Sequence, residues 1–236
     1  MLKTVRNAFK VEDIRKRLLY TLLMLVVVRF GSQLPTPGVD PTFIQNFFAQ
    51  QTGDAFNFFE AFTGGSFTRM SVFALSITPY ITSSIIIQLL TIAIPKLEEI
   101  QRDGEEGRKK MVALTRYVTI VLALIQSIAM TIGFYRGGYL TGQGPLAVIE
   151  VITGLTAGSA VLMWIGERIT EKGIGNGISI VLVINIISRM PEDMGTLWSQ
   201  FIANKSIPKG IVAGLIIIAI IVAMVVFVVV LQDAER

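Results

Sequence analysis

Acidic side chains are the residues of this chain best able to do chemistry, because the sequence contains no histidine and no cysteine. Paired aspartates at mid-membrane depth would fit an intramembrane protease, and a buried carboxylate would fit an ion-coupled transporter. However, Glu150 and Glu167 fall near the ends of apolar stretches. The aspartates fall outside these stretches, at Asp13, Asp40, Asp54, Asp103, Asp193 and Asp233. Without histidine or cysteine there is also no HExxH motif, thiolate or imidazole metal site, disulfide or histidine-activated nucleophile. We therefore expect no enzyme activity, no metal and no cofactor.

Hydroxyl and amide side chains interrupt the otherwise apolar residues 71–88. They are Ser71, Ser76, Thr78, Thr82, Ser83, Ser84 and Gln88, and Pro79 lies near the middle of the predicted span. Such side chains mediate helix packing in membranes and satisfy a carbonyl that proline leaves free. They would equally suit a face against a water-filled pore, and both interpretations stay open at this point.

A phenylalanine-rich segment covers residues 55–67 and is too short to cross a membrane. It carries Phe56, Phe58, Phe59, Phe62 and Phe67 around Glu60. The flexible pair Gly64 and Gly65 lies within it. The residues alone favour an amphipathic helix at the outer membrane interface, where aromatic residues are enriched. The alternative is a re-entrant helix hinged at the two glycines.

The elements that must position these residues are membrane spans. Hydrophobic residues make up 52% of the 236 residues and charged residues 16%, well below the roughly 25% of soluble domains. Apolar windows of about the length that crosses a bilayer fall near residues 18–34, 72–94, 112–134, 146–166, 174–190 and 210–231. We therefore expect an all-α integral membrane protein with about six spans.

Basic residues predict the orientation of the spans. Fifteen of the 21 lysines and arginines lie on one side, which we assign to the cytoplasm, and five on the other. Arg29 lies within the first span near its outer end, where it can snorkel. Residues 1–17 have an apolar face and predict a cytoplasmic amphipathic helix rather than a cleavable signal. The net charge of +4 is explained by membrane orientation, so we expect no direct sequence-specific binding of nucleic acid.

Several glycines predict close packing and a turn. The pairs Gly154 with Gly158 and Gly210 with Gly214 have the small-xxx-small spacing that lets helices approach. Residues 173–177, with three glycines, predict a tight cytoplasmic turn that enters the fifth span.

Five strings, in this order, carry a resemblance to a known family. They are Gly31-Ser-Gln-Leu-Pro-Thr-Pro-Gly38, Phe73-Ala-Leu-Ser-Ile-Thr-Pro-Tyr-Ile81, Ser84-Ile-Ile-Ile-Gln-Leu-Leu90, Met163-Trp-Ile-Gly-Glu-Arg-Ile-Thr170 and Glu171-Lys-Gly-Ile-Gly-Asn-Gly-Ile-Ser-Ile180. Together with the span pattern they resemble the bacterial SecY family, which forms the pore of the Sec protein-translocation channel. The family has ten spans in two inverted halves. The resemblance thus implies that residues 18–190 are the first five-helix half, with a plug at 55–69. Residues 191–236 would be an outer loop and the sixth span, where the second half begins.

The resemblance also implies site residues. The positions that match the family's apolar pore ring are Ile77, Ile81, Ile178 and Leu182. The phenylalanine-rich segment matches the plug, a short helix that moves aside during translocation, and this replaces the interfacial interpretation. Its predicted residues are Phe56, Phe58, Phe59, Phe62, Gly64 and Gly65. Candidates for the polar face of a lateral gate are Thr82, Gln88 and Gln126.

By resemblance, the function is a channel that passes unfolded secretory polypeptides and releases apolar segments into the bacterial plasma membrane. The implied partners are the subunits SecE and SecG, the motor SecA or the ribosome, signal sequences and nascent chains, and membrane lipids. The alternative is a secondary transporter of a small solute, which would share broken helices and inverted repeats. A scaffold or insertase-like helper without a pore is a further rival. Since the chain stops at Arg236, we expect residues 1–236 alone not to translocate.

Overall fold

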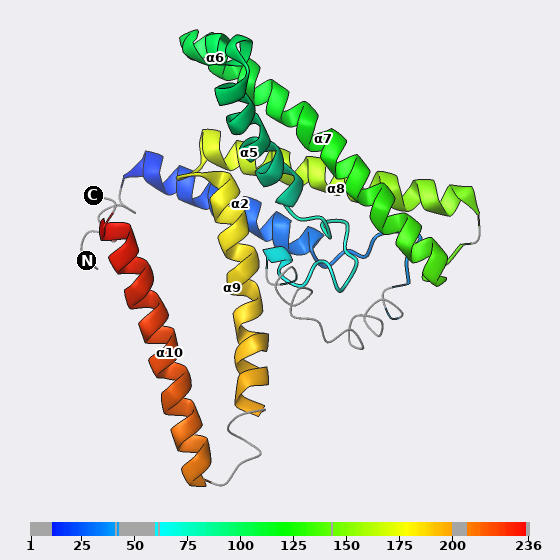
Figure 1. Cartoon of the computed structure of the whole chain (residues 1–236). Helices are drawn as coiled ribbons and strands as arrows, with labels where there is room; N and C mark the ends of the chain where they lie inside the picture. The colour runs from blue at the N-terminus through cyan, green and yellow to red at the C-terminus, as the bar shows by residue number, and fades with distance from the viewer. Residues whose placement is uncertain are drawn as a thin grey trace. The chain divides into compact units, whose positions relative to one another are not determined.

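The computed structural model describes residues 11–40, 42, 60, 62–142, 144–199 and 207–234. Within these ranges the regular elements are all helices, as predicted, and the extended pairings are isolated bridges of Pro35 with Ser71 and Val39 with Leu140. The helices are α2 (Glu12–Gly31), α5 (Thr78–Ala93), α6 (Pro95–Arg102), α7 (Gly104–Gly137), α8 (Pro145–Lys172), α9 (Gly177–Trp198) and α10 (Ile207–Ala234) (Figure 1). The chain forms two compact units, Met1–Ser188 and Arg189–Arg236, and their boundary falls within α9.

Each of the six predicted apolar windows overlaps one of these helices, but the helices differ in how well they suit a bilayer. Among the described residues, α7, α8 and Gly214–Ala234 of α10 are long and apolar enough to cross a membrane, and α5 with α6 could form a fourth span. The helices α2 and α9 lack an 18-residue stretch that is both strongly apolar and limited to two charged residues. Three basic residues, at positions 15–17, lie in the first turns of α2, and α9 has charged residues at 189, 192 and 193. Residues 12–17 of the predicted amphipathic segment are therefore continuous with the first span, and residues 1–10 lie outside the described part.

Proline and glycine determine where several helices begin and end. Pro95 directly follows the break between α5 and α6, and these helices bend by 104° there. A proline removes a backbone donor and disfavours helical geometry in the residue before it. Gly138 ends α7 in the left-handed conformation, with a φ of 75°. Pro145 lies in the first turn of α8, where its missing N–H costs no helical hydrogen bond.

The expected position of Pro79 in the middle of a span is wrong. The helix α5 begins at Thr78, so Pro79 lies in its first turn. Residues 72–77 form turns, and Ser76 has a φ of 52°, which a right-handed helix cannot contain. The chain therefore enters the predicted second span as buried irregular backbone and becomes helical only at its seventh residue, Thr78.

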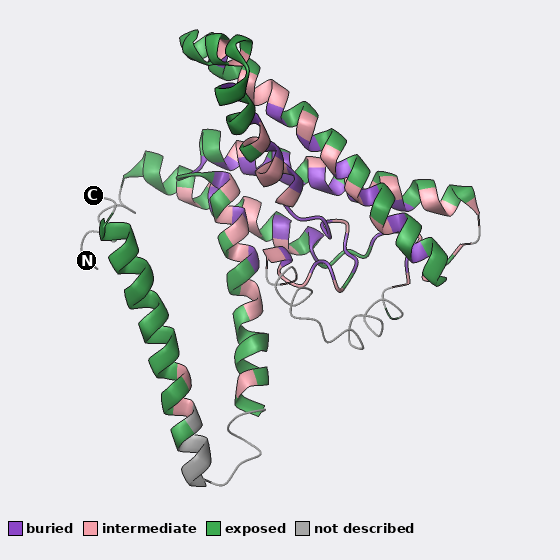
Figure 2. Ribbon diagram, viewed as in Figure 1, coloured by how far each residue is buried: buried purple, intermediate pink, exposed green. Residues whose placement is uncertain are grey.

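The core of the first unit is centred on α8, which has more buried residues than any other described helix (Figure 2). One apolar cluster joins α8 to α7 and to the turns before α5. Its buried members are Val39, Met70, Ala74, Leu75, Ala123, Phe134, Val151 and Leu155. A second cluster joins α8 to α2, α5 and α9. Its buried members are Val28, Phe73, Ile77, Leu162, Ile165, Ile169 and Val181.

The predicted small-xxx-small pair on α8 does allow a close approach, but not of another helix. A Cβ atom on Gly158 would lie 1.9 Å from the carbonyl oxygen of Val72, and one on Gly154 would lie 3.3 Å from Cγ2 of Thr36. Both partners belong to irregular segments that are buried against α8. The glycines therefore make room for backbone whose polar groups must be protected from lipid.

Hydrogen bonds between side chains join neighbouring helices of the first unit. Between α5 and α7, the hydroxyl groups of Ser83 and Thr119 lie 2.6 Å apart, and Ser83 also donates to the carbonyl oxygen of Thr115 at 3.1 Å. Between α7 and α8, the hydroxyl groups of Ser127 and Thr156 lie 2.8 Å apart. These contacts hold α5, α7 and α8 together as one layered assembly. The second unit is different, because within Gly214–Ala234 of α10 no residue is buried.

Candidate functional site

The four predicted ring residues come together in the second apolar cluster. Ile77 and Ile81 lie one turn apart at the start of α5, and Ile178 and Leu182 lie one turn apart at the start of α9. Ile77 is 1% exposed and fully buried, and the other three are partly buried against the same cluster. Two helices that are far apart in the sequence thus present aliphatic side chains to a common region, as an i, i+4 spacing on each helix allows.

Gly166 of α8 lets the two pairs approach each other. A Cβ atom at this position would lie 2.5 Å from Cδ1 of Ile178 and 3.5 Å from Cδ1 of Ile77. The end of the Ile178 side chain therefore occupies the space that a larger residue on α8 would fill, and the end of Ile77 lies in van der Waals contact with that space. A substitution at residue 166 would have to move a residue of the predicted ring.

The start of α9 is fixed by close backbone contact and by local hydrogen bonds. A Cβ atom on Gly177 would lie 2.0 Å from the carbonyl oxygen of Gly166, so α8 and α9 touch there. The backbone N–H of Gly177 donates to the Thr170 hydroxyl at 2.8 Å, and that of Ile178 donates to the Asn176 side chain at 3.0 Å. Residues 173–176 form the predicted turn between α8 and α9. These contacts determine the direction in which Ile178 leaves the turn.

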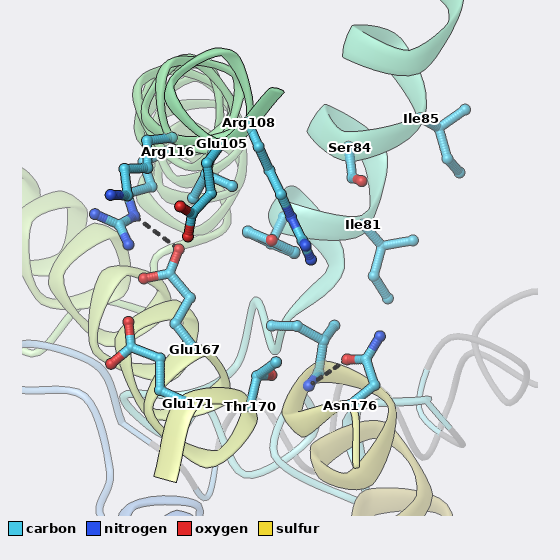
Figure 3. A pocket seen from close by; sticks show the side chains of 14 residues that line it. Ile81, Ser84, Ile85, Glu105, Arg108, Arg116, Glu167, Thr170, Glu171 and Asn176 are labelled. Atoms are coloured by element: carbon cyan, nitrogen blue, oxygen red, sulfur yellow. Dashed lines mark hydrogen bonds and ion pairs between the residues drawn. The ribbon is translucent and has the colours of Figure 1, made fainter. Parts of the chain in front are cut away.

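A cavity of about 700 Å³ adjoins the cluster (Figure 3). Ile81 and Ile178 line it together with charged residues of both signs from α7 and α8. The charged residues are Glu105, Arg108, Lys109, Arg116, Glu167 and Glu171. The first unit therefore combines a cavity lined by equal numbers of acidic and basic residues with aliphatic side chains along part of its wall.

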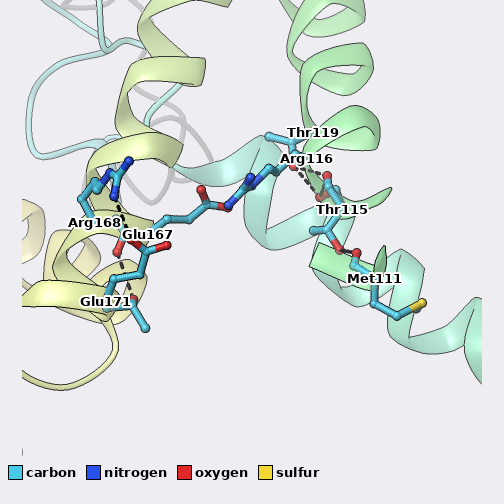
Figure 4. Close-up of polar contacts among 10 residues, drawn as sticks. Met111, Thr115, Arg116, Thr119, Glu167, Arg168 and Glu171 are labelled. Atoms are coloured by element: carbon cyan, nitrogen blue, oxygen red, sulfur yellow. Dashed lines mark hydrogen bonds and ion pairs between the residues drawn. The ribbon is translucent and has the colours of Figure 1, made fainter. Parts of the chain in front are cut away.

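An ion pair in the wall of this cavity connects α7 to α8. The guanidinium group of Arg116 donates to the carboxylate of Glu167 at 2.7 Å (Figure 4). The Glu167 side chain is 14% exposed, whereas Arg116 is 45% exposed. The pair is thus partly screened from water, and it fixes one side of the cavity. Sequence reasoning placed Glu167 near a helix end but did not find its partner, which lies 51 positions away.

The predicted plug is described only in its second half. Phe56, Phe58 and Phe59 lie outside the described residues, whereas Phe62, Gly64 and Gly65 lie within them. Gly64 and Gly65 have φ values of 64° and 80°, in the left-handed region that favours glycine. Gly64 lies against α9, because a Cβ atom on it would be 2.7 Å from the carbonyl oxygen of Asn185.

The three predicted gate residues lie on α5 and α7, two helices that pack against each other. Thr82 and Gln126 are partly buried and Gln88 is exposed. Within the described part of the chain, no hydrogen bond joins these three side chains to one another. The polar contact between α5 and α7 is instead made by Ser83 with Thr115 and Thr119. Sequence reasoning noted Ser83 but did not identify its partners on α7.

A comparison with known protein families decides the identity. A model of the SecY family matches residues 71–236. The chain belongs to the SecY family. It is 42% identical over 209 residues to the protein translocase subunit SecY of Bacillus subtilis. The alignment covers 86% of this chain and 48% of the relative. It is also 42% identical to the subunit of the same name from Halalkalibacterium halodurans, over 84% of this chain and 46% of the relative.

A third relative with the same name, from Pseudomonas aeruginosa, is 40% identical over 78% of this chain and 42% of its own length. The chain thus spans about half the length of the curated relatives it matches. These SecY relatives are named for protein translocation, so the alternative of a small-solute transporter is not supported.

Solved structures show the same channel fold. The chain is similar to Sec61 in the canine ribosome-channel complex from the endoplasmic reticulum, with a TM-score of 0.55 and 19% identity. The alignment covers 80% of this chain and 38% of the Sec61 chain. A structure described as that of a protein conducting channel gives the same values. This member of the SecY family is therefore a multi-pass membrane protein with the all-helical architecture of these channels.

Proposed function

We propose that this chain supplies part of the wall and half of the seal of a protein-conducting channel. Unfolded secretory polypeptides would pass through the channel, and apolar segments would leave it sideways into the bilayer. One observation carries the proposal: Ile77, Ile81, Ile178 and Leu182 gather beside a charged cavity of about 700 Å³. The names of the relatives, which are translocase subunits, agree with it.

The seal would work because its side chains are apolar and flexible. A narrow aliphatic constriction expels water and thereby resists the passage of ions. Isoleucine and leucine side chains can move apart around an extended polypeptide without breaking hydrogen bonds or leaving a charge buried. The adjoining cavity keeps a polypeptide hydrated until it reaches the constriction.

Lateral release would follow from the partition of each segment between channel and lipid. At about −0.5 kcal/mol for each leucine or isoleucine, ten such residues favour lipid by about 5 kcal/mol. One charge at the centre of the bilayer costs roughly 2.5–3.5 kcal/mol. We propose that α5 and α7 form one wall of the exit, with Thr82, Gln88 and Gln126 on its polar face.

The phenylalanine-rich segment would close the outer side of the constriction when the channel is idle. The left-handed conformations of Gly64 and Gly65 support a hinge at the end of this segment. Phenylalanine contacts can be broken and remade without exposing buried charges, so the segment could move aside reversibly. We place the N-terminus and the basic loops in the cytoplasm of a bacterial cell, at the plasma membrane.

The partners we propose are SecE and SecG in the membrane and SecA or the ribosome at the cytoplasmic face. Signal sequences, nascent chains and surrounding lipids would contact the channel directly. The presence of a ribosome in the canine Sec61 complex supports a role for a ribosome at related channels.

Cross-linking of a trapped substrate tests the proposal. The chain has no cysteine, so single cysteines at positions 81 and 178 would be the only thiols in this part of the channel. With the full-length channel that contains this chain, we expect a stalled secretory polypeptide to cross-link at both positions. The matched control is Ile149→Cys, because Ile149 is an exposed apolar residue of α8 outside the cavity. Equal cross-linking at all three positions, or none at 81 and 178, would contradict a central pore.

A further inference from the structure

Ser76, the residue before Ile77, has a backbone conformation that side chains disfavour. Its φ is 52°, and Met70 is the other described non-glycine residue with a positive φ. Left-handed geometry of this kind persists only where the surroundings hold it in place. Ser76 lies two residues before the start of α5, next to the N-cap residue Ile77, and is 1% exposed. Its conformation therefore determines the direction in which Ile77 and the first turn of α5 begin.

The backbone N–H of Ser76 donates to the carbonyl oxygen of Phe73 at 2.8 Å, and the side-chain contact of Ser76 comes from α9. The side-chain amide of Asn185 donates to the Ser76 hydroxyl at 3.2 Å, and both groups are buried. Asn185 is 2% exposed and lies within the predicted fifth span. A polar side chain at such a position is costly unless a hydrogen bond compensates it. The bond to Ser76 satisfies the amide nitrogen, whereas the carboxamide oxygen of Asn185 is buried without a hydrogen-bond partner among the described residues.

Asn185 also belongs to the narrow face through which α9 meets the rest of the first unit. The buried residues of α9 are Gly177, Val181 and Asn185, spaced by four and therefore on one stripe of the helix. The ring residues Ile178 and Leu182 each follow a member of this stripe by one position. Since Gly64 lies against the Asn185 backbone, this residue contacts both ends of the segment that leads from the proposed plug hinge to Ile77.

We propose that Asn185 is a positioning residue for the constriction. Its carboxamide holds Ser76 in the left-handed conformation and so aligns the pair on α5 with the pair on α9. Without this bond, Ser76 relaxes toward an ordinary conformation, the first turn of α5 rotates, and Ile77 leaves its place beside Gly166. The inference rests on the proposed function, because it concerns the tightness of the same seal.

The test measures the resting ion leak of the full-length channel, reconstituted with its partner subunits in vesicles. We expect Asn185→Leu and Ser76→Ala each to raise the leak about tenfold, roughly the factor by which one lost buried hydrogen bond shifts an equilibrium. The double variant should leak no more than either single variant, because both changes remove the same bond. The matched control is Ser127→Ala, which removes a hydroxyl contact between α7 and α8 away from the ring.

A glycine at position 76 separates positioning from simple packing. Glycine adopts positive φ without help, so Ser76→Gly alone should stay ion-tight. In combination with Asn185→Leu, it should restore most of the tightness that Asn185→Leu loses. A leak from Asn185→Leu no greater than that of Ser127→Ala would overturn the inference, as would a combined variant that leaks as much as Asn185→Leu.

The same vesicles distinguish this inference from the proposed function. If the unmodified channel passes a secretory polypeptide but Asn185→Leu is as tight as the control, only the role of Asn185 fails. If the unmodified channel passes no polypeptide, the proposed function fails, and the inference fails with it.

Discussion

The helices α5 and α9 each carry two residues of the proposed seal, but they are held in different ways. The first turns of α5 lie along α7, and Ser83 makes two hydrogen bonds across that interface. In contrast, α9 meets the rest of the first unit through one stripe of three buried residues, which begins at a backbone contact between Gly177 and Gly166. The pair on α5 therefore depends on polar contacts over a broad interface, whereas the pair on α9 depends on close backbone contact and on the bond from Asn185 to Ser76. Single substitutions should do more damage on α9 than on α5.

The largest effect should come from Gly177→Ala. The added methyl group would lie 2.0 Å from a carbonyl oxygen, which cannot move without displacing α8. We expect a loss of about 3 kcal/mol in the free energy of unfolding, at the upper end of what overpacking costs. Thermal unfolding of the full-length channel in detergent would measure it. The control is Gly133→Ala on α7, where no atom lies within 4 Å of the added group. If both variants unfold alike, close contact does not hold α9.

An intermediate effect is expected for Ser83→Ala on α5. The variant loses the bonds to Thr119 and to the Thr115 carbonyl, and a bond between helices in a membrane contributes about 1 kcal/mol. The matched control is Ser84→Ala, because Ser84 lines the cavity and makes no hydrogen bond in the described part of the chain. Comparing Ser83→Ala with Gly177→Ala in the same unfolding assay sharpens the contrast. If the Ser83→Ala variant were less stable than the Gly177→Ala variant, the expected order of effects on α5 and α9 would be reversed.

The smallest effect should come from Glu167→Gln, which removes an ion pair behind the α5 side of the seal. We expect a loss of about 0.5 kcal/mol, since Arg116 remains partly hydrated and exposed pairs contribute little. The difference should shrink at high salt, which screens such pairs. Glu171→Gln is the control, because the bond from Arg168 to Glu171 lies within α8 and joins no second helix. Unfolding curves of both variants at low and high salt would measure this difference. A loss of several kcal/mol in the free energy of unfolding that does not depend on salt would contradict the ranking.

Sequence patterns were sufficient for the helices but not for the contacts between them. Apolar windows predicted where α2, α5, α7, α8, α9 and α10 lie, because hydrophobic length is a local property. The start of α5 was misplaced, because the conformation of Ser76 depends on a residue 109 positions later. The partner of Glu167 was missed for the same reason.

The site itself could be predicted only through resemblance. Isoleucine and leucine in a membrane helix usually face lipid, so no pattern distinguishes Ile77 or Leu182 from their neighbours. Asn185 did carry a signal, since it is a polar residue in an apolar window, but its purpose needed the contact with Ser76. Gly166 was recognised only as part of a family string. Its contacts with Ile77 and Ile178 depend on the packing of α5 and α9 against α8, which the sequence does not show.

Gly166 has a consequence for how such a passage can be tuned. It is buried and lies outside the lining of the cavity, yet the tip of Ile178 rests where its side chain would be, with the tip of Ile77 next to it. If the four residues form the proposed constriction, its calibre would be set from behind, by a buried position outside the cavity lining. A related protein could widen or narrow its opening there, in single-carbon steps, while leaving every exposed surface unaltered.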